Sequence, residues 1–121
     1  MNENVKNTGK DLEGKVALIT GGGRGIGAAT AEFLAEHGAS IVIADVNLDS
    51  AKAQAEKMDK EGYKVHAAHV DVTSVSSVDK LVAEALNVFG KIDILVNNAG
   101  IANFKKLPDV TEEDWRSEEH T

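Results

Sequence analysis

The chain has 121 residues and no cysteine, carries a formal net charge of −7, and is 42% hydrophobic and 27% charged. This size and composition indicate one globular domain with a sizeable core, and they exclude disulfide or thiolate chemistry. The scattered lysines argue against nucleic-acid binding, and the lack of any apolar run near the roughly 20 residues that cross a bilayer excludes a membrane protein.

A polar tail covers residues 1–11 and lacks the apolar segment of a secretory signal, so the cytoplasm is the predicted compartment. After this tail, strand-like runs alternate with helix-like stretches. The strand-like runs cover residues 15–20, 40–45, 64–69 and 92–97, and the helix-like stretches cover about 25–37, 48–61 and 75–89. This order predicts an α/β fold with a doubly wound parallel sheet of the Rossmann type, because nearly continuous apolar strands need helices on both faces.

The turn after the first predicted strand reads Thr-Gly-Gly-Gly-Arg-Gly-Ile-Gly over residues 20–27. Glycines let a backbone approach phosphates closely, and the start of the following helix attracts negative charge. The sequence therefore predicts a site for the diphosphate of a dinucleotide, although three glycines in a row also form ordinary flexible turns. The candidate binding residues are Gly21, Gly23, Arg24, Gly25, Ile26 and Gly27.

Two glycine registers fit this turn. The register Gly21-x-x-x-Gly25-x-Gly27 begins where the strand ends and is preferred. The alternative, Gly23-x-Gly25-x-x-Ala28, matches the commoner dinucleotide fingerprint but begins two residues late. Neither register is the phosphate loop of a nucleoside triphosphatase, which needs Gly-Lys followed by Ser or Thr. Hydrolysis of ATP or GTP is therefore not expected.

An acid closes the second predicted strand. Asp45 follows Gly27 by eighteen residues, close to the spacing of about 20 residues at which a carboxylate holds ribose hydroxyls. The alternative interpretation of Asp45 is a solvated strand end.

The third predicted strand leads into a second polar segment. Asp71 and Val72 follow its carboxyl end, where ligands of open α/β sheets collect. Thr73 or Ser74 is expected to cap the next helix. The two histidines within the strand, at positions 66 and 69, point to opposite faces, so a shared metal is not expected.

The fourth predicted strand runs into Asn97-Asn98-Ala99-Gly100. With this segment, the glycine turn and Asp71-Val72, the chain resembles a short-chain dehydrogenase/reductase over about residues 12–115. The resemblance implies that these residues are the N-terminal part of a dinucleotide-binding Rossmann domain, with an incomplete sheet. It implies that the glycine turn holds the diphosphate, that Asp71 meets the adenine amino group, and that Val72 lies against the adenine ring. It places Asn98, Ala99 and Gly100 against the nicotinamide ribose, and the asparagine pair also ties adjacent strands.

The predicted cofactor is NAD, with NADP as the alternative. A carboxylate at Asp45 within about 4 Å of a 2′-phosphate would cost roughly 1 to 4 kcal/mol. Arg24 points the other way, because the resemblance implies that a basic residue in this turn accompanies NADP in some members of the family.

The resemblance implies an oxidoreductase that transfers a hydride between a nicotinamide cofactor and an alcohol or ketone, and that forms a homo-oligomer at full length. The substrates left open range from 3-oxoacyl thioesters to small alcohols and sugars. In the family, the catalytic Ser and Tyr-x-x-x-Lys lie farther beyond the Asn-Asn-Ala-Gly segment than the 21 residues that follow it here. The only tyrosine, Tyr63, precedes this segment. No catalytic residue is therefore assigned, and the 121-residue chain itself is expected to be inactive.

Residues 116–121, Arg-Ser-Glu-Glu-His-Thr, are what the start of a common sequencing adapter encodes in one reading frame, so we expect a non-native tail. Two other functions stay open: a non-catalytic nucleotide-binding module, and an S-adenosylmethionine-dependent methyltransferase. The second also combines a glycine-rich first turn with acids after the next strands, but the Asn-Asn-Ala-Gly segment weighs against it.

Overall fold

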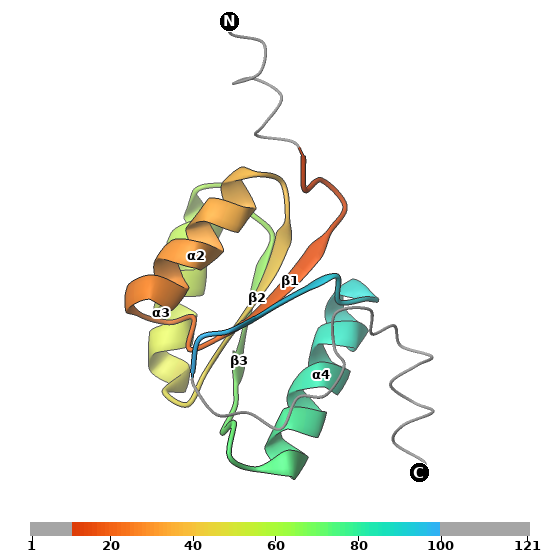
Figure 1. Ribbon diagram of the computed structural model, residues 1–121. Coiled ribbons are helices and arrows are strands. Elements are labelled where there is room, and N and C mark those ends of the chain that lie inside the picture. The colour runs from red at the N-terminus through yellow and green to blue at the C-terminus, as the bar shows by residue number, and fades with distance from the viewer. Residues whose placement is uncertain (1–10, 100–121) are drawn as a thin grey trace, which may run out of the picture.

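One parallel sheet joins all the predicted strands in the computed structural model, which describes residues 11–99 (Figure 1). Its strand order is β3-β2-β1-β4. The strands are β1 (Val16–Thr20), β2 (Ser40–Asp45), β3 (Val65–His69) and β4 (Ile94–Asn97). The helices between them are α2 (Gly25–Glu36), α3 (Leu48–Lys60) and α4 (Val75–Phe89). The predicted α/β fold is confirmed.

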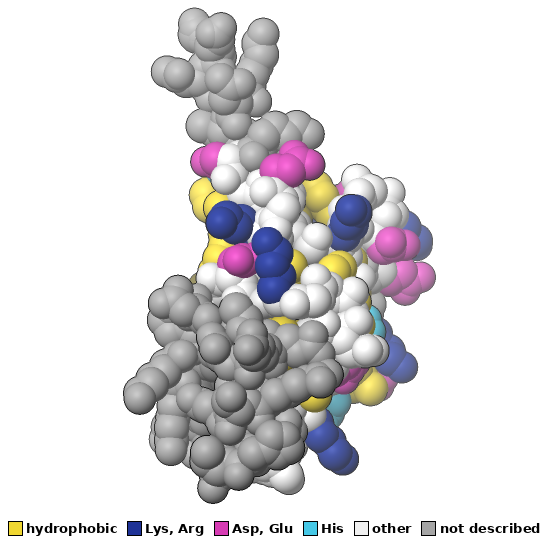
Figure 2. Space-filling view, turned by 90° about the vertical axis from the view of Figure 1, so that its right-hand side faces the viewer, with side chains coloured by type: hydrophobic (Ala, Val, Ile, Leu, Met, Phe, Trp, Pro, Cys, Tyr) yellow, Lys and Arg dark blue, Asp and Glu magenta, His cyan; other side chains and the backbone are white. Residues whose placement is uncertain are grey.

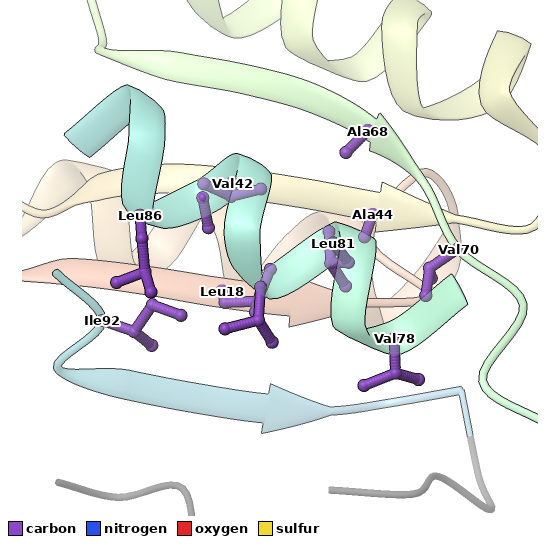
Figure 3. Close-up of a cluster of buried hydrophobic side chains, with 11 residues drawn as sticks. Leu18, Val42, Ala44, Ala68, Val70, Val78, Leu81, Leu86 and Ile92 are labelled. Carbon is purple, nitrogen blue, oxygen red and sulfur yellow. The ribbon is translucent and has the colours of Figure 1, made fainter. Parts of the chain in front are cut away.

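The helices cover both faces of the sheet. In Figure 1, α2 and α3 lie on one side of the strands and α4 on the other. Alternate residues of β1 show why the strand is apolar throughout, because Leu18 packs under α4 while Ala17 and Ile19 pack toward α2 and α3. Figure 3 shows the α4 side, where Leu81 and Leu86 point toward the sheet.

The strand β4 differs from the two central strands. It pairs with β1 alone among the described residues, and its side chains are only half-buried or exposed, whereas every residue of β1 is buried. It also begins two residues later than predicted. Asp93, just before it, still joins β1, because its backbone N–H donates to the carbonyl of Val16 (2.8 Å) and its carboxylate accepts from the Val16 N–H (2.8 Å).

Local capping signals fix where the helices start and end. Asn47 caps α3 by accepting from the Ser50 N–H, and Ser74, one of the two predicted candidates, caps α4 by accepting from the Ser77 N–H. The helix α2 ends before Gly38, whose φ of +104° favours glycine. Within residues 11–99, no helix combines the length and the apolar character needed to cross a membrane.

The connections place the site. The chain moves outward from β1 through β2 to β3 and then returns to β4 on the other side of β1. Ligands of open α/β sheets bind beyond the carboxyl ends of the strands, at the point where the direction of winding changes. Here that point lies between β1 and β4, whose last residues, Thr20 and Asn97, are register partners.

Candidate functional site

A cleft of about 790 Å³ opens at the carboxyl ends of the strands. Its volume is in the range of small-molecule sites. The lining contains every residue proposed from the sequence except Gly23, Gly27 and Gly100, the last of which lies outside the described residues. The lining residues are Gly21, Arg24, Gly25, Ile26, Asp45, Val46, Val70, Asp71, Val72, Asn98 and Ala99.

Sequence reasoning missed two valines of this lining. Val70 is buried and directly precedes Asp71, whereas Val46 directly follows Asp45 and is 64% exposed. Both positions follow the ends of strands, so the rule that ligands collect at the carboxyl ends of strands was the signal that could have found them.

The start of α2 faces the cleft without a side-chain cap. Arg24 is the N-cap residue in an extended conformation, but its side chain makes no cap hydrogen bond, and no acid stands in the first turn. The backbone leads into the helix through Gly21 (φ +67°) and Gly25 (φ +56°), a region that favours glycine. This leaves backbone N–H groups and the positive end of the helix dipole available to an anion.

Gly23 and Gly27 are glycines because of close packing. A Cβ on Gly27 would overlap the carbonyl oxygen of Gly21, and a Cβ on Gly23 would lie 2.8 Å from the Cβ and carbonyl carbon of Ser50 and the nitrogen of Ala51, at the start of α3. The turn therefore packs against its own beginning and against α3. Positive φ at the first two glycines and close approach at the third fit the register Gly21-x-x-x-Gly25-x-Gly27.

Asp45 is a buried carboxylate, 3% exposed, at the end of β2. Its Oδ2 accepts from the Gly23 N–H (3.0 Å), and its Oδ1 accepts from the Asn47 N–H (3.0 Å). The Arg24 guanidinium lies 3.6 Å from Oδ1, although the arginine side chain is 65% exposed. The interpretation of Asp45 as a solvated strand end is therefore wrong.

Asp71 also reaches the cleft, but its partners are local. Its Oδ1 accepts from the Thr73 hydroxyl (2.6 Å) and the Thr73 N–H (3.0 Å). These two hydrogen bonds hold the pKa of Asp71 below its usual value, and the bond from the hydroxyl has the larger effect. The carboxylate is therefore kept charged, and it is oriented by a neighbour two residues away.

The asparagine pair joins β4 to β1. The Thr20 hydroxyl donates to Asn97 Oδ1 (2.9 Å), and the Asn98 N–H donates to the Thr20 carbonyl (3.2 Å). The Asn98 side chain donates to the Gly21 carbonyl (3.4 Å) and lines the cleft. The pair thus ties the two strands, and it carries Asn98 to the glycine turn.

The structure also shows how the histidines and the basic side chains are arranged between residues 11 and 99. No three His, Cys, Asp or Glu side chains between residues 11 and 99 gather as a metal site. His66 instead pairs with Glu84 of α4, with Nε2 2.6 Å from Oε2. On the face in Figure 2, the described basic side chains lie among acidic ones and form no basic stripe.

Comparison with known proteins decides the family. A model of the short chain dehydrogenase family matches residues 15–121. The chain belongs to this family. It is 45% identical over 104 residues to a sorbitol dehydrogenase from Cereibacter sphaeroides, an alignment that covers 86% of this chain and 40% of that protein. It is 45% identical over 105 residues to elsinochrome reductase 1 from Elsinoe fawcettii, covering 86% and 39%. The chain thus spans about two fifths of the length of these relatives.

Solved structures of short-chain dehydrogenases show the same architecture. A hydroxysteroid dehydrogenase from Escherichia coli matches with a TM-score of 0.72 and 38% identity, over 76% of this chain and 39% of that one. A short chain dehydrogenase/reductase from Burkholderia phymatum in complex with NAD matches with a TM-score of 0.68 and 36% identity, over 70% and 30%. The sheet is therefore an incomplete Rossmann-type sheet.

Proposed function

We propose that this chain binds a nicotinamide dinucleotide and is the cofactor-binding part of an oxidoreductase that acts on alcohols or ketones. The observation that carries the proposal is that the uncapped start of α2 and Asn98 line one cleft of about 790 Å³, where Asn98 also donates to the Gly21 carbonyl of the glycine turn. Two structural neighbours support it, because one is a complex with NAD and another, a 7α-hydroxysteroid dehydrogenase, is a complex with NADH.

Each end of the cleft has a role in this proposal. Backbone N–H groups at Gly25 and Ile26 hold the diphosphate, because the helix start offers unpaired donors. Asp45 accepts from the hydroxyls of the adenine ribose. At the end of β3, Asp71 meets the adenine amino group and Val72 lies against its ring. Asn98, Ala99 and Gly100 lie against the nicotinamide ribose, with Gly100 outside the described residues.

The cofactor favoured by this geometry is NAD. A 2′-phosphate beside Asp45 would bring two negative charges within about 4 Å, at a cost of roughly 1 to 4 kcal/mol. The Arg24 guanidinium, which lies 3.6 Å from the same carboxylate, would offset only part of this cost.

At full length, the reaction is transfer of a hydride from the alcohol carbon to the nicotinamide ring, while the alcohol proton passes to a base and a carbonyl forms. The reverse reaction reduces a ketone. The residues around the cleft bind and orient the cofactor, and we place these residues in a domain that begins near residue 12 and continues to about residue 115. Membership of the dehydrogenase family does not favour the methyltransferase or the non-catalytic module.

Calorimetric titration of the chain with NAD, NADP and S-adenosylmethionine tests the proposal. We expect NAD to bind at least about tenfold more tightly than NADP, because a repulsion of 1.4 kcal/mol corresponds to a factor of ten in affinity. We expect S-adenosylmethionine not to bind. The matched control is Asp59→Ala, which removes an exposed carboxylate at the far end of α3 and should leave the titrations unchanged. Tighter binding of NADP would contradict the role of Asp45, and the absence of binding by either dinucleotide would contradict the function.

A further inference from the structure

We propose that Asp45 is also the positioning residue that holds the glycine turn in its anion-binding shape. This inference rests on the proposed function. The carboxylate is 3% exposed. It accepts from the backbone N–H of Gly23, in the turn after β1, and from that of Asn47, in the turn after β2, each at 3.0 Å. One side chain thus joins two crossover connections of the sheet.

The turn is fixed from two further directions. The Gly22 N–H donates to the carbonyl of Ala44 (3.1 Å), which anchors the turn to β2. On the opposite side, Gly23 rests on the start of α3, where a Cβ would come within 2.8 Å of Ser50 and Ala51. At Gly23 the turn therefore has no space to move toward α3 unless α3 moves as well.

The start of α3 belongs to the same network. Asn47 donates its N–H to Asp45 and accepts from the Ser50 N–H through Oδ1 (3.1 Å). Asp45 therefore holds Asn47, and Asn47 caps the helix at Ser50, the residue that Gly23 packs against. A closed loop of contacts runs from Asp45 through Asn47 and Ser50 to Gly23 and back to Asp45.

Holding the turn and contacting a ribose are compatible for one carboxylate. Its two oxygens offer about four acceptor positions, and the two backbone N–H groups use one on each oxygen. The remaining positions are available to ribose hydroxyls. In this arrangement Gly23, which does not line the cleft, supports the diphosphate site without touching the cofactor.

The inference predicts that changes at Asp45 weaken ligands that never reach the adenine ribose. Inorganic pyrophosphate is such a probe, because it engages the turn alone. Asp45→Glu keeps the negative charge but displaces the carboxylate by a methylene, so it separates loss of geometry from loss of charge. We expect about tenfold weaker pyrophosphate binding, as for loss of a hydrogen bond to a charged group.

Gly23→Ala perturbs the turn from the α3 side and leaves the carboxylate in place. It should weaken pyrophosphate by a similar factor while keeping the preference for NAD over NADP. Asp45→Glu should also weaken pyrophosphate, whereas its retained negative charge should keep the preference for NAD over NADP. The control is Asp59→Glu, an exposed position on α3, which should change neither. Full pyrophosphate affinity in Asp45→Glu would overturn the inference.

Amide hydrogen exchange supplies a readout without any ligand. In the unmodified chain the Gly23 and Asn47 N–H groups should be protected, and in Asp45→Glu their exchange should accelerate more than that of amides in α4. Rapid exchange of both groups in the unmodified chain would overturn the inference even if the variants do not fold. If the unmodified chain binds no dinucleotide but protects these amides, the proposed function fails while the structural role of Asp45 stands.

Discussion

The carboxyl ends of β2 and β3 each bring an aspartate to the cleft, but the two acids are held in different ways. Asp45 is buried and accepts from backbone groups of two separate turns, one of them 22 residues away in the sequence. Asp71 is held by Thr73, which is two residues away, through its hydroxyl and its N–H. The β2 end is thus built by tertiary contacts and the β3 end by its own turn.

This difference separates two kinds of binding residue. Removing Asp45 takes the acceptor away from two part-buried N–H···O bonds, which costs more than losing the exposed bonds of Asp71. Removing Asp71 frees the hydroxyl and N–H of Thr73, which are exposed and can donate to water instead. A change at the first acid should therefore affect the fold and the site together, whereas a change at the second should affect the site alone.

A large effect is expected in the glycine turn itself. Gly27→Ala should lower the free energy of unfolding by about 1–3 kcal/mol, because the added methyl group meets the rigid backbone at Gly21. Urea unfolding measures it. Gly25→Ala is the matched control, because its Cβ would meet nothing within 4 Å and only the positive φ would cost energy. If both variants had the same urea midpoint, the close packing of the turn would not be the reason for Gly27.

Substituting both aspartates tests the comparison directly. Asp45→Asn should lower the free energy of unfolding by about 1–3 kcal/mol, because its amide offers one acceptor oxygen where the carboxylate supplied two charged ones. Asp71→Asn should leave the urea midpoint unchanged within error. Equal destabilisation by the two variants would mean that the β2 end is no more dependent on tertiary contacts than the β3 end.

Arg24 should have a smaller effect on cofactor choice. Its ion pair with Asp45 is long, and its side chain is mostly exposed, so the pair is worth about 0.2–1 kcal/mol. Among the described residues, Arg24 is the only cationic side chain that lines the cleft. Arg24→Gln removes this charge and should therefore strengthen the preference for NAD over NADP by up to about fivefold. Competitive titration of the two dinucleotides measures the ratio, and a weakened preference would assign Arg24 another role.

The smallest effect concerns the charge of Asp71. Its pKa is lowered in the folded chain, so the stabilisation by its hydrogen bonds is complete above its usual value of about 3.9 and is lost as the pH falls through the lowered pKa. Thr73→Val should raise this pKa toward the usual value. An NMR titration of the Asp71 carboxyl carbon would show it, with Thr73→Ser as the control that keeps the hydroxyl. An unchanged titration in Thr73→Val would exclude the hydroxyl as the main cause.

Much of the fold was predictable because its signals are local. Strand-like runs located the described strands, with β1, β2 and β4 in apolar runs, and Asn47, Ser74 and Gly38 mark helix ends through interactions within a few residues. The late start of β4 was not predictable in this way. Ile92 belongs to the apolar run, but it packs in the core before the strand begins. The backbone N–H and carboxylate of Asp93 bond to the backbone of Val16, so the regular pairing of β4 with β1 begins only after Asp93.

The sequence by itself determined the α/β order and the side chains that gather at the carboxyl ends of the strands, because these follow from periodicity and spacing, and its motifs carried the resemblance to the family. Only the tertiary structure decided what those residues do to one another. It showed Gly23 resting on α3, Asp45 buried between two turns, and Val46 and Val70 in the lining. Such contacts join segments far apart in the chain, and packing, which sets their distances, leaves no local pattern in the sequence.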